Sequence, residues 1–217
     1  MSGMDATVDA VGELTLFSRH AEVTVDVGRG AISSIRATEP GTGLVEVARL
    51  VDTGLEPLSG SSGCGWTLVA TGRLDGGWAC CLLRIGNAGT LRHRRIVRVG
   101  PDTGVTLHDW VSNDSETGVD LIRRPVLEPA SGFSWMDPGP PVESVEQTGD
   151  EVVALWARGS ANTARAEYEF RQHLAPGKEL SYRLVTCPAA DSERRGRAPS
   201  SKIVSRAALP SIDAGSP

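Results

Sequence analysis

The sequence predicts an all-β fold, a large antiparallel β-sandwich of about a dozen strands with few or no helices. Apolar and polar residues alternate with a period of two along most of residues 13–187, which is typical of half-buried strands. No stretch of ten or more residues shows the 3.6-residue apolar spacing of an amphipathic helix. The 25 glycines and 13 prolines are spread along the chain, as many short strands with many turns require.

The first half of the chain contains six predicted strands. Ala21, Val23, Val25 and Val27 share one face of the first strand, and a glycine-bearing turn at residues 28–30 leads into its hairpin partner. A Gly- and Ser-rich loop precedes the fourth strand, and an Asp-Gly-Gly turn connects the fourth strand to the fifth. The six predicted strands are residues 21–27, 31–36, 44–51, 66–71, 78–85 and 91–99.

The second half is predicted in the same way. The strand at residues 105–112 follows a Gly-Pro-Asp-Thr-Gly turn and has strict alternation. Residues 127–141 are rich in proline, which cannot donate to a strand ladder, so this passage is expected to be a loop or an edge. The remaining predicted strands are residues 119–126, 143–148, 151–158, 164–174 and 179–187.

Composition predicts one domain, with a flexible N-terminus and a disordered or partner-docking tail. The chain has 217 residues, of which 40% are hydrophobic and 23% charged, so it can form a substantial core. We expect a flexible N-terminus at residues 1–12, a sandwich domain at 13–187, and a disordered or partner-docking tail at 188–217. The tail is mainly Ala, Ser, Arg and Pro, and it cannot bury much apolar surface.

Several classes of function are disfavoured. The formal net charge is -5 without long runs of like charge, so we expect no nucleic-acid partner. The start resembles no secretory signal and no run of 18 apolar residues occurs, so we expect no membrane partner and a cytoplasmic location. The four cysteines and four histidines lack metal-ligand spacing, and no nucleotide-binding motif is present, so neither a metal nor a cofactor is expected.

A first candidate site is the group of His108, Trp110 and Asn113. The two rings lie on one face of the strand at residues 105–112, and Asn113 follows its end. An aromatic ring offers a platform for the C–H face of a sugar, while His and Asn offer directional hydrogen bonds. The alternative is that Trp110 belongs to the core and His108 is satisfied beside it.

A second group lies in and just before the proline-rich passage, where Arg123, Arg124, Glu128 and Trp135 combine charge with an aromatic ring. Loops on a rigid sandwich often carry binding sites, so this group is a candidate rim of a pocket. The alternative is a loop fixed by a buried tryptophan.

A third group is the alternating charged face of residues 164–174, formed by Arg165, Glu167, Glu169, Arg171 and His173. As a ligand surface, it would place carboxylates and guanidinium groups against hydroxyls, and a Glu or His could transfer protons. The alternative is a solvated face with cross-strand ion pairs.

The order of three motifs resembles the galactose-mutarotase-like family, the aldose 1-epimerase-like supersandwich proteins. The motifs are the opening hairpin at residues 21–35, the VTLHDWVSN strand at 105–113 and the closing LAPGKEL turn at 174–180. This resemblance implies a supersandwich-like fold and a sugar ligand. Two departures are clear: no histidine follows Asn113 where catalytic members have one, and only Glu167 or Glu169 could stand for the catalytic glutamate.

We therefore expect a carbohydrate-recognising sandwich that binds or acts on a sugar or a glycosylated small molecule. If it is catalytic, metal-free acid/base chemistry of an epimerase-like isomerase or lyase would use His108 as proton carrier and Glu128 or Glu167 as its partner. Arg124 or Arg171 would anchor the substrate. The alternatives are an isomerase, lyase or cyclase of secondary metabolism, and a non-catalytic subunit. A homodimer, or a partner protein docked through the tail, also fits.

Overall fold

The computed structural model of the chain is all-β, and its sheets are antiparallel at all but one strand pair among the residues that it describes. These are residues 7–8, 12–39, 41–56, 65–74, 77–86, 90–100, 104–136, 142–143, 149–158, 166–167 and 170–188. Within them, twelve strands have five residues or more and no residue is helical. The predicted large antiparallel sandwich is therefore confirmed, and the described part contains no helix able to span a membrane.

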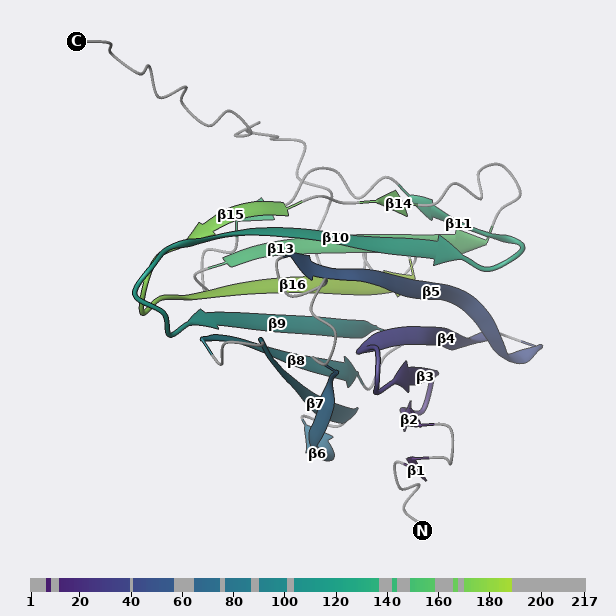
Figure 1. Cartoon of the computed structure of the whole chain (residues 1–217). Helices are drawn as coiled ribbons and strands as arrows, with labels where there is room; N and C mark the ends of the chain where they lie inside the picture. The colour runs from purple at the N-terminus through teal and green to yellow at the C-terminus, as the bar shows by residue number, and fades with distance from the viewer. Residues whose placement is uncertain are drawn as a thin grey trace.

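The first sheet, sheet A, contains eight strands and places β10 beside β5 (Figure 1). Its strand order is β1-β2-β3-β4-β5-β10-β14, and β15 also pairs with β10. All of its pairs are antiparallel. The strands are β1 (Thr7–Val8), β2 (Glu13–Phe17), β3 (Ala21–Asp26), β4 (Ala31–Glu39), β5 (Gly43–Glu56), β10 (Val119–Pro129), β14 (Ala166–Glu167) and β15 (Phe170–Leu174).

The second sheet, sheet B, also contains eight strands, in the order β11-β13-β16-β9-β8-β7-β6, with β12 paired to β13. One pair, β13 with β16, is parallel. The strands are β6 (Thr67–Leu74), β7 (Gly77–Ile85), β8 (Leu91–Val99), β9 (Val105–Asn113), β11 (Phe133–Met136), β12 (Val142–Glu143), β13 (Gly149–Arg158) and β16 (Glu179–Pro188).

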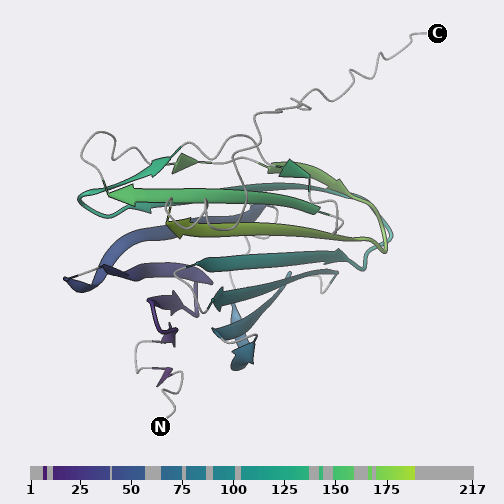
Figure 2. The same cartoon turned by 180° about the vertical axis from the view of Figure 1, so that it is seen from behind.

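The two sheets form two layers that enclose a main apolar core (Figures 1 and 2), and a smaller second cluster contains Leu91, Val111, Leu121 and Leu174. The core exists because alternate residues of each strand are apolar, and a strand turns alternate side chains to the same face. Leu14 and Val23 enter it from sheet A, and Leu82, Val97 and Leu107 enter it from sheet B. In β9 the buried and half-buried residues alternate without exception. The residues between the inward ones therefore form the outer face of sheet B.

The proline-rich passage differs from its prediction. Strand β10 continues through Pro125 to Pro129, beyond the predicted end, and β11 forms at residues 133–136. A register shift between Arg123 and Pro125 against β5 explains how the proline is accommodated, since an irregularity removes the need for its missing N–H. Of this passage, expected to be a loop or an edge, residues 133–136 form a strand at the edge of sheet B, whereas residues 127–129 extend β10.

Other boundaries also differ. Within the predicted strand at residues 164–174, the described residues form β14 and β15, and β2 was not predicted. Residues 7–8 pair with β2, within the stretch expected to be flexible. Residues 144–148 of a predicted strand and residues 189–217 of the predicted tail lie outside the described residues.

Candidate functional site

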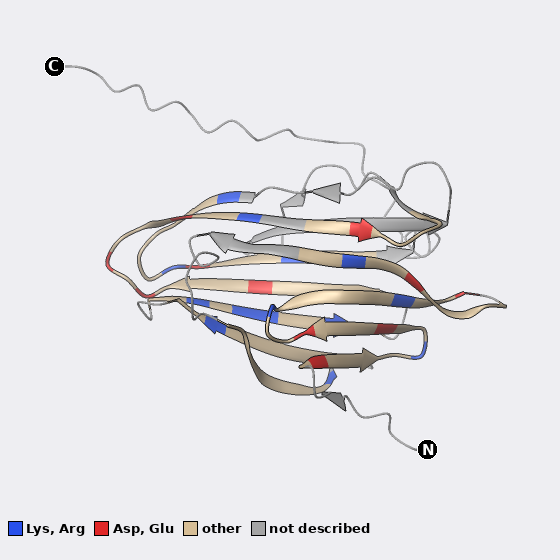
Figure 3. Cartoon of the chain, turned by 45° about the vertical axis from the view of Figure 1, so that its right-hand side comes forward, with Lys and Arg blue, Asp and Glu red and all other residues tan. Residues whose placement is uncertain are grey.

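Strands β8 and β9 send charged side chains to both faces of sheet B. β8 carries only basic residues among its charged positions, and Asp109 is the one charged residue of β9 (Figure 3). His93, Arg95 and Asp109 occupy inward positions, and Arg95 lies directly opposite Asp109 in the antiparallel register. Arg95 is 0% exposed and Asp109 1%, so this pair is buried inside the sandwich.

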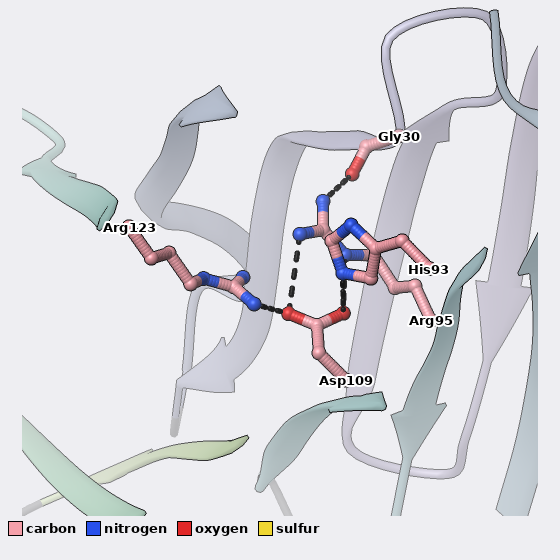
Figure 4. Close-up of polar contacts among 5 residues, drawn as sticks. All are labelled: Gly30, His93, Arg95, Asp109 and Arg123. Carbon is pink, nitrogen blue, oxygen red and sulfur yellow. Dashed lines mark hydrogen bonds and ion pairs between the residues drawn. The ribbon is translucent and has the colours of Figure 1, made fainter. Parts of the chain in front are cut away.

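Asp109 is the centre of an ionic cluster between the two sheets (Figure 4). Arg95 donates from Nε to Oδ1 at 2.8 Å and from Nη2 to Oδ2 at 3.2 Å, a bidentate arrangement. His93 Nε2 lies 3.2 Å from Oδ1, and Arg123 of β10 contacts Oδ2 through Nη1. Arg95 Nη1 also donates to the carbonyl of Gly30. The cluster therefore connects β8 and β9 with two segments of sheet A.

Aromatic rings surround the cluster. Trp66 lies against His93 edge-on at 4.6 Å between ring centroids, and the Arg95 guanidinium lies 4.7 Å from the Trp66 centroid. The guanidinium of Arg123, from sheet A, lies 4.4 Å from the ring of Tyr182, which belongs to β16 of sheet B. These cation–π contacts help to stabilise guanidinium groups that are removed from water.

A small cavity adjoins the cluster and has a volume of about 30 Å³. This volume has room for a water molecule or two, and it is far below the roughly 300–1,000 Å³ of small-molecule sites. We therefore assign the cluster and its cavity to the structure of the sandwich and not to a sugar site. The lining residues are Asp109, Val111, Leu121, Arg123, Gln172, Leu180, Ser181 and Tyr182.

This cluster was not predicted from the sequence, although one signal was present. Asp109 occupies the same alternation phase as Val105, Leu107 and Val111, which are all buried. A carboxylate in an inward phase needs a buried cationic partner, because burying it unpaired is costly. The basic residues of β8, which pairs with β9, could have been predicted as this cationic partner. Arg123 could not have been predicted as a partner from the local sequence.

The outer face of sheet B holds the first predicted group. His108 and Trp110 stack with ring centroids 3.5 Å apart and an interplanar angle of 28°. The Arg94 guanidinium lies 4.6 Å from the Trp110 ring, across the β8–β9 ladder. Trp110 and His108 are half-buried and Arg94 is exposed. The predicted core alternative for Trp110 does not apply, because its side chain lies on the face opposite the sandwich core.

We call this surface the Trp110 face and define it by the outward-facing positions of three adjacent strands. β9 pairs with β8 along its whole length and with β16 over residues 105–112, so the outward positions form continuous rows. The positions are Arg92, Arg94, Ile96, Arg98, Thr106, His108, Trp110, Ser112, Glu179 and Arg183; Ser181 and Val185 continue the row of β16 but are buried.

Asn113 has a different role from the predicted one. Its Nδ2 donates to the carbonyls of Thr117 at 2.8 Å and Leu174 at 3.1 Å. Its Oδ1 accepts from Ser115 N at 3.0 Å and from Ser115 Oγ at 2.6 Å. An amide side chain has two donors and two acceptor positions, so all of them are used within the fold. Asn113 therefore organises the turn between β9 and β10, and the geometry leaves it no capacity for a ligand.

Arg171 and His173 lie on the other layer of the molecule. They alternate along β15 with Gln172, which lines the internal cavity, and Leu174, which is buried, so they face outward from sheet A. His173 Nδ1 lies 2.7 Å from Asp120 Oδ1, with side chains 63% and 86% exposed. This is a solvated cross-strand pair of the kind expected as the alternative. The structure does not bring these residues together with His108 and Trp110.

The predicted acid/base pair is not formed either. Glu128 belongs to sheet A, where it lies opposite Arg49 in the register, whereas His108 faces away from sheet A. The pKa of Arg49 is raised, mainly by its hydrogen bond to Glu46 and to a smaller extent by the charge of Glu128. The side chains of Arg124, Trp135 and Glu167 lie outside the described residues, so their predicted roles stay predictions.

The described cysteines have no reactive environment. Cys80 points into the core, and burial raises the pKa of its thiol to about 12. Burial also raises the pKa of Cys81. In the described part of the chain, no group of three His, Cys, Asp or Glu side chains is arranged to hold a metal ion.

The fold places this chain among β-sandwich proteins. No protein-family model matches it, and no curated protein matches its sequence. The resemblance to the galactose-mutarotase-like family therefore stays a prediction.

Proposed function

We propose that the protein is a carbohydrate-binding β-sandwich whose ligand contacts the Trp110 face. The observation that carries this proposal is the His108–Trp110 stack with Arg94 beside it, on the outer face of paired strands. An indole ring is suited to the C–H face of a pyranose, because both surfaces are flat and weakly polar. The exposed Arg94 guanidinium supplies directional hydrogen bonds to hydroxyls.

The Trp110 ring is held rigidly by its strand and by its stacking on His108. Trp110 is in a strand paired on both sides, to β8 and to β16, and its ring is stacked on His108. Arg94 is exposed and long, so its guanidinium can leave the Trp110 ring and donate to a ligand at little cost in packing. Such preorganised aromatic residues lower the ordering cost of binding.

The proposal is for binding and not for catalysis. His108 and Glu128 belong to different sheets, and His108 faces away from the sheet that holds Glu128. A general acid and a general base must both reach the reacting atoms, which this placement does not provide. The family resemblance at residues 21–35 and 105–113 supports a sugar as the ligand class.

Titration calorimetry with a panel of neutral and acidic hexasaccharides tests the proposal. We expect binding by at least one member, a loss of tenfold or more in affinity for Trp110→Ala, and partial retention for Trp110→Phe, which keeps a ring. Circular dichroism confirms that each variant is folded. Absence of binding across the panel, or an unchanged affinity for Trp110→Ala, would contradict the proposal.

A further inference from the structure

The Trp110 face has an excess of positive charge. Its described outward positions hold four arginines, Arg92, Arg94, Arg98 and Arg183, and one carboxylate, Glu179. The whole chain has a net charge of -5, so this excess is local and does not reflect a basic protein. A cluster of like charges on one surface raises the local concentration of oppositely charged ligands.

These arginines are spaced widely enough to contact a ligand longer than one sugar ring. Arg94 and Arg98 are four residues apart on β8, about 13 Å at the rise of a strand. Ile96, between them, lies opposite His108 on β9, and Arg183 lies opposite His108 on its other side. The guanidinium groups therefore surround the His108–Trp110 stack over a distance greater than one pyranose ring. A ligand that uses them all has more than one sugar unit.

Part of this charge is already engaged within the protein. Arg92 Nε lies 3.1 Å from Asp114 Oδ2, with side chains 60% and 46% exposed. Arg98 and Arg183 also interact with other groups of the protein. A guanidinium has five N–H donors, so an arginine that already interacts within the protein can also donate hydrogen bonds to a ligand. Arg94, exposed and in contact with the Trp110 ring, has the most accessible position.

We propose that the ligand of the Trp110 face is an acidic oligosaccharide, whose carboxylate or sulfate groups bind the arginines while a sugar ring contacts Trp110. This inference rests on the proposed carbohydrate-binding function and names its ligand class. Guanidinium groups recognise carboxylate and sulfate oxygens through paired, charge-assisted hydrogen bonds, which a neutral sugar cannot form. Because exposed charges are screened by salt, binding weakens as ionic strength rises.

The test compares four probes on the folded, full-length chain at 50 and 300 mM NaCl. These are a galacturonic acid hexamer, a sulfated dextran oligosaccharide, the neutral maltohexaose and a single-stranded DNA hexamer. We expect an acidic sugar to bind at least tenfold more tightly than maltohexaose at low salt and to weaken at high salt. The two acidic probes distinguish carboxylate from sulfate as the anionic group.

Arginine variants locate the charge effect. Arg94→Gln and Arg98→Gln should each weaken binding of the acidic sugar about tenfold, as expected for a lost hydrogen bond between charged groups. Arg29→Gln is the matched control, since Arg29 is 85% exposed and lies in the β3–β4 turn of sheet A. It should leave the affinity unchanged.

The outcomes separate the inference from the function on which it rests. Equal or tighter binding of maltohexaose, or salt-independent binding of the acidic sugars, overturns the acidic ligand class and leaves carbohydrate binding standing. Failure of every sugar to bind overturns both. Tighter binding of the DNA hexamer than of either acidic sugar also overturns both, because the arginines would then serve nucleic acid.

Discussion

Asp109 links the two layers of the sandwich through buried ionic contacts. It accepts from Arg95 in its own sheet and contacts Arg123 of sheet A, while its own side chain is 1% exposed. Buried charges require partners, because the free energy of leaving water is otherwise not recovered.

Asp109→Asn should lower the free energy of unfolding by about 3–5 kcal/mol, because two buried guanidinium groups lose their counter-charge. Urea denaturation followed by circular dichroism measures this change. Asp120→Asn is the control at an exposed His–Asp pair and should cost less than about 1 kcal/mol. Equal losses in the two variants would show that the cluster does not stabilise the sandwich.

Cys80 gives a residue-scale prediction about pH. Burial raises its pKa to about 12, whereas an unfolded cysteine titrates near about 8.5. The contribution of the neutral thiol to stability is complete below pH about 8.5 and is lost as pH rises toward 12, because only the unfolded chain releases the proton. The free energy of unfolding should therefore fall by about 1.4 kcal/mol per pH unit from this group.

Between pH 9.5 and 11.5, Cys80→Ala should make the fall of the unfolding free energy with pH less steep by about 1.4 kcal/mol per pH unit. This change in slope is expected whatever the effect of the substitution on stability at neutral pH. Urea titrations at several pH values measure the slope. Cys81→Ala serves as the comparison, because Cys81 is only half-buried on the outer face. A slope identical to that of the unmodified chain would contradict the burial of the Cys80 thiol.

At the scale of elements, the glycine in the β3–β4 turn makes a tertiary contact possible. Gly30 has φ of +64°, and a Cβ there would lie 2.4 Å from Nε1 of Trp66. Its carbonyl accepts from Arg95 of sheet B. Glycine at this position therefore provides both the left-handed conformation and the close approach of Trp66.

Gly30→Ala can be compared with Gly177→Ala, a turn glycine with φ of +65° and open space around it. Gly177→Ala should cost about 1–2 kcal/mol, the penalty of the left-handed conformation alone. Gly30→Ala should cost about 1–3 kcal/mol more, because Trp66 must move. Thermal or urea unfolding of both variants provides the comparison, and equal losses would argue against the close Gly30–Trp66 packing.

Local patterns predicted most of the strands but not all of their ends. Alternation with glycine-bearing turns found β3, β4, β8 and β9, because each of these strands has one buried and one wetter face. The continuation of β10 beyond residue 126 to Pro129 could not be predicted, since it depends on pairing with β5, a strand distant in sequence. The pairing of both β14 and β15 with β10 likewise depends on contacts distant in sequence.

At the scale of the whole molecule, alternation correctly separated His108 and Trp110 from the inward residues of β9. It could not reveal which layer each strand joins. The predicted site combined residues that the topology places on opposite layers, with His108 and Trp110 on sheet B and Arg171 and His173 on sheet A. Sheet membership is set by long-range pairing, which residue spacing does not encode.

The central claim is that the outer face of sheet B, around Trp110, is the ligand-binding surface of this sandwich. Fluorine NMR of the chain labelled with 5-fluorotryptophan tests it, because the five tryptophans give separate signals and Trp110→Phe assigns one of them. On titration with the galacturonic acid hexamer, the Trp110 signal should shift while that of the buried Trp66 stays in place. Saturation of the protein with bound hexamer while the Trp110 signal stays unmoved would contradict the claim.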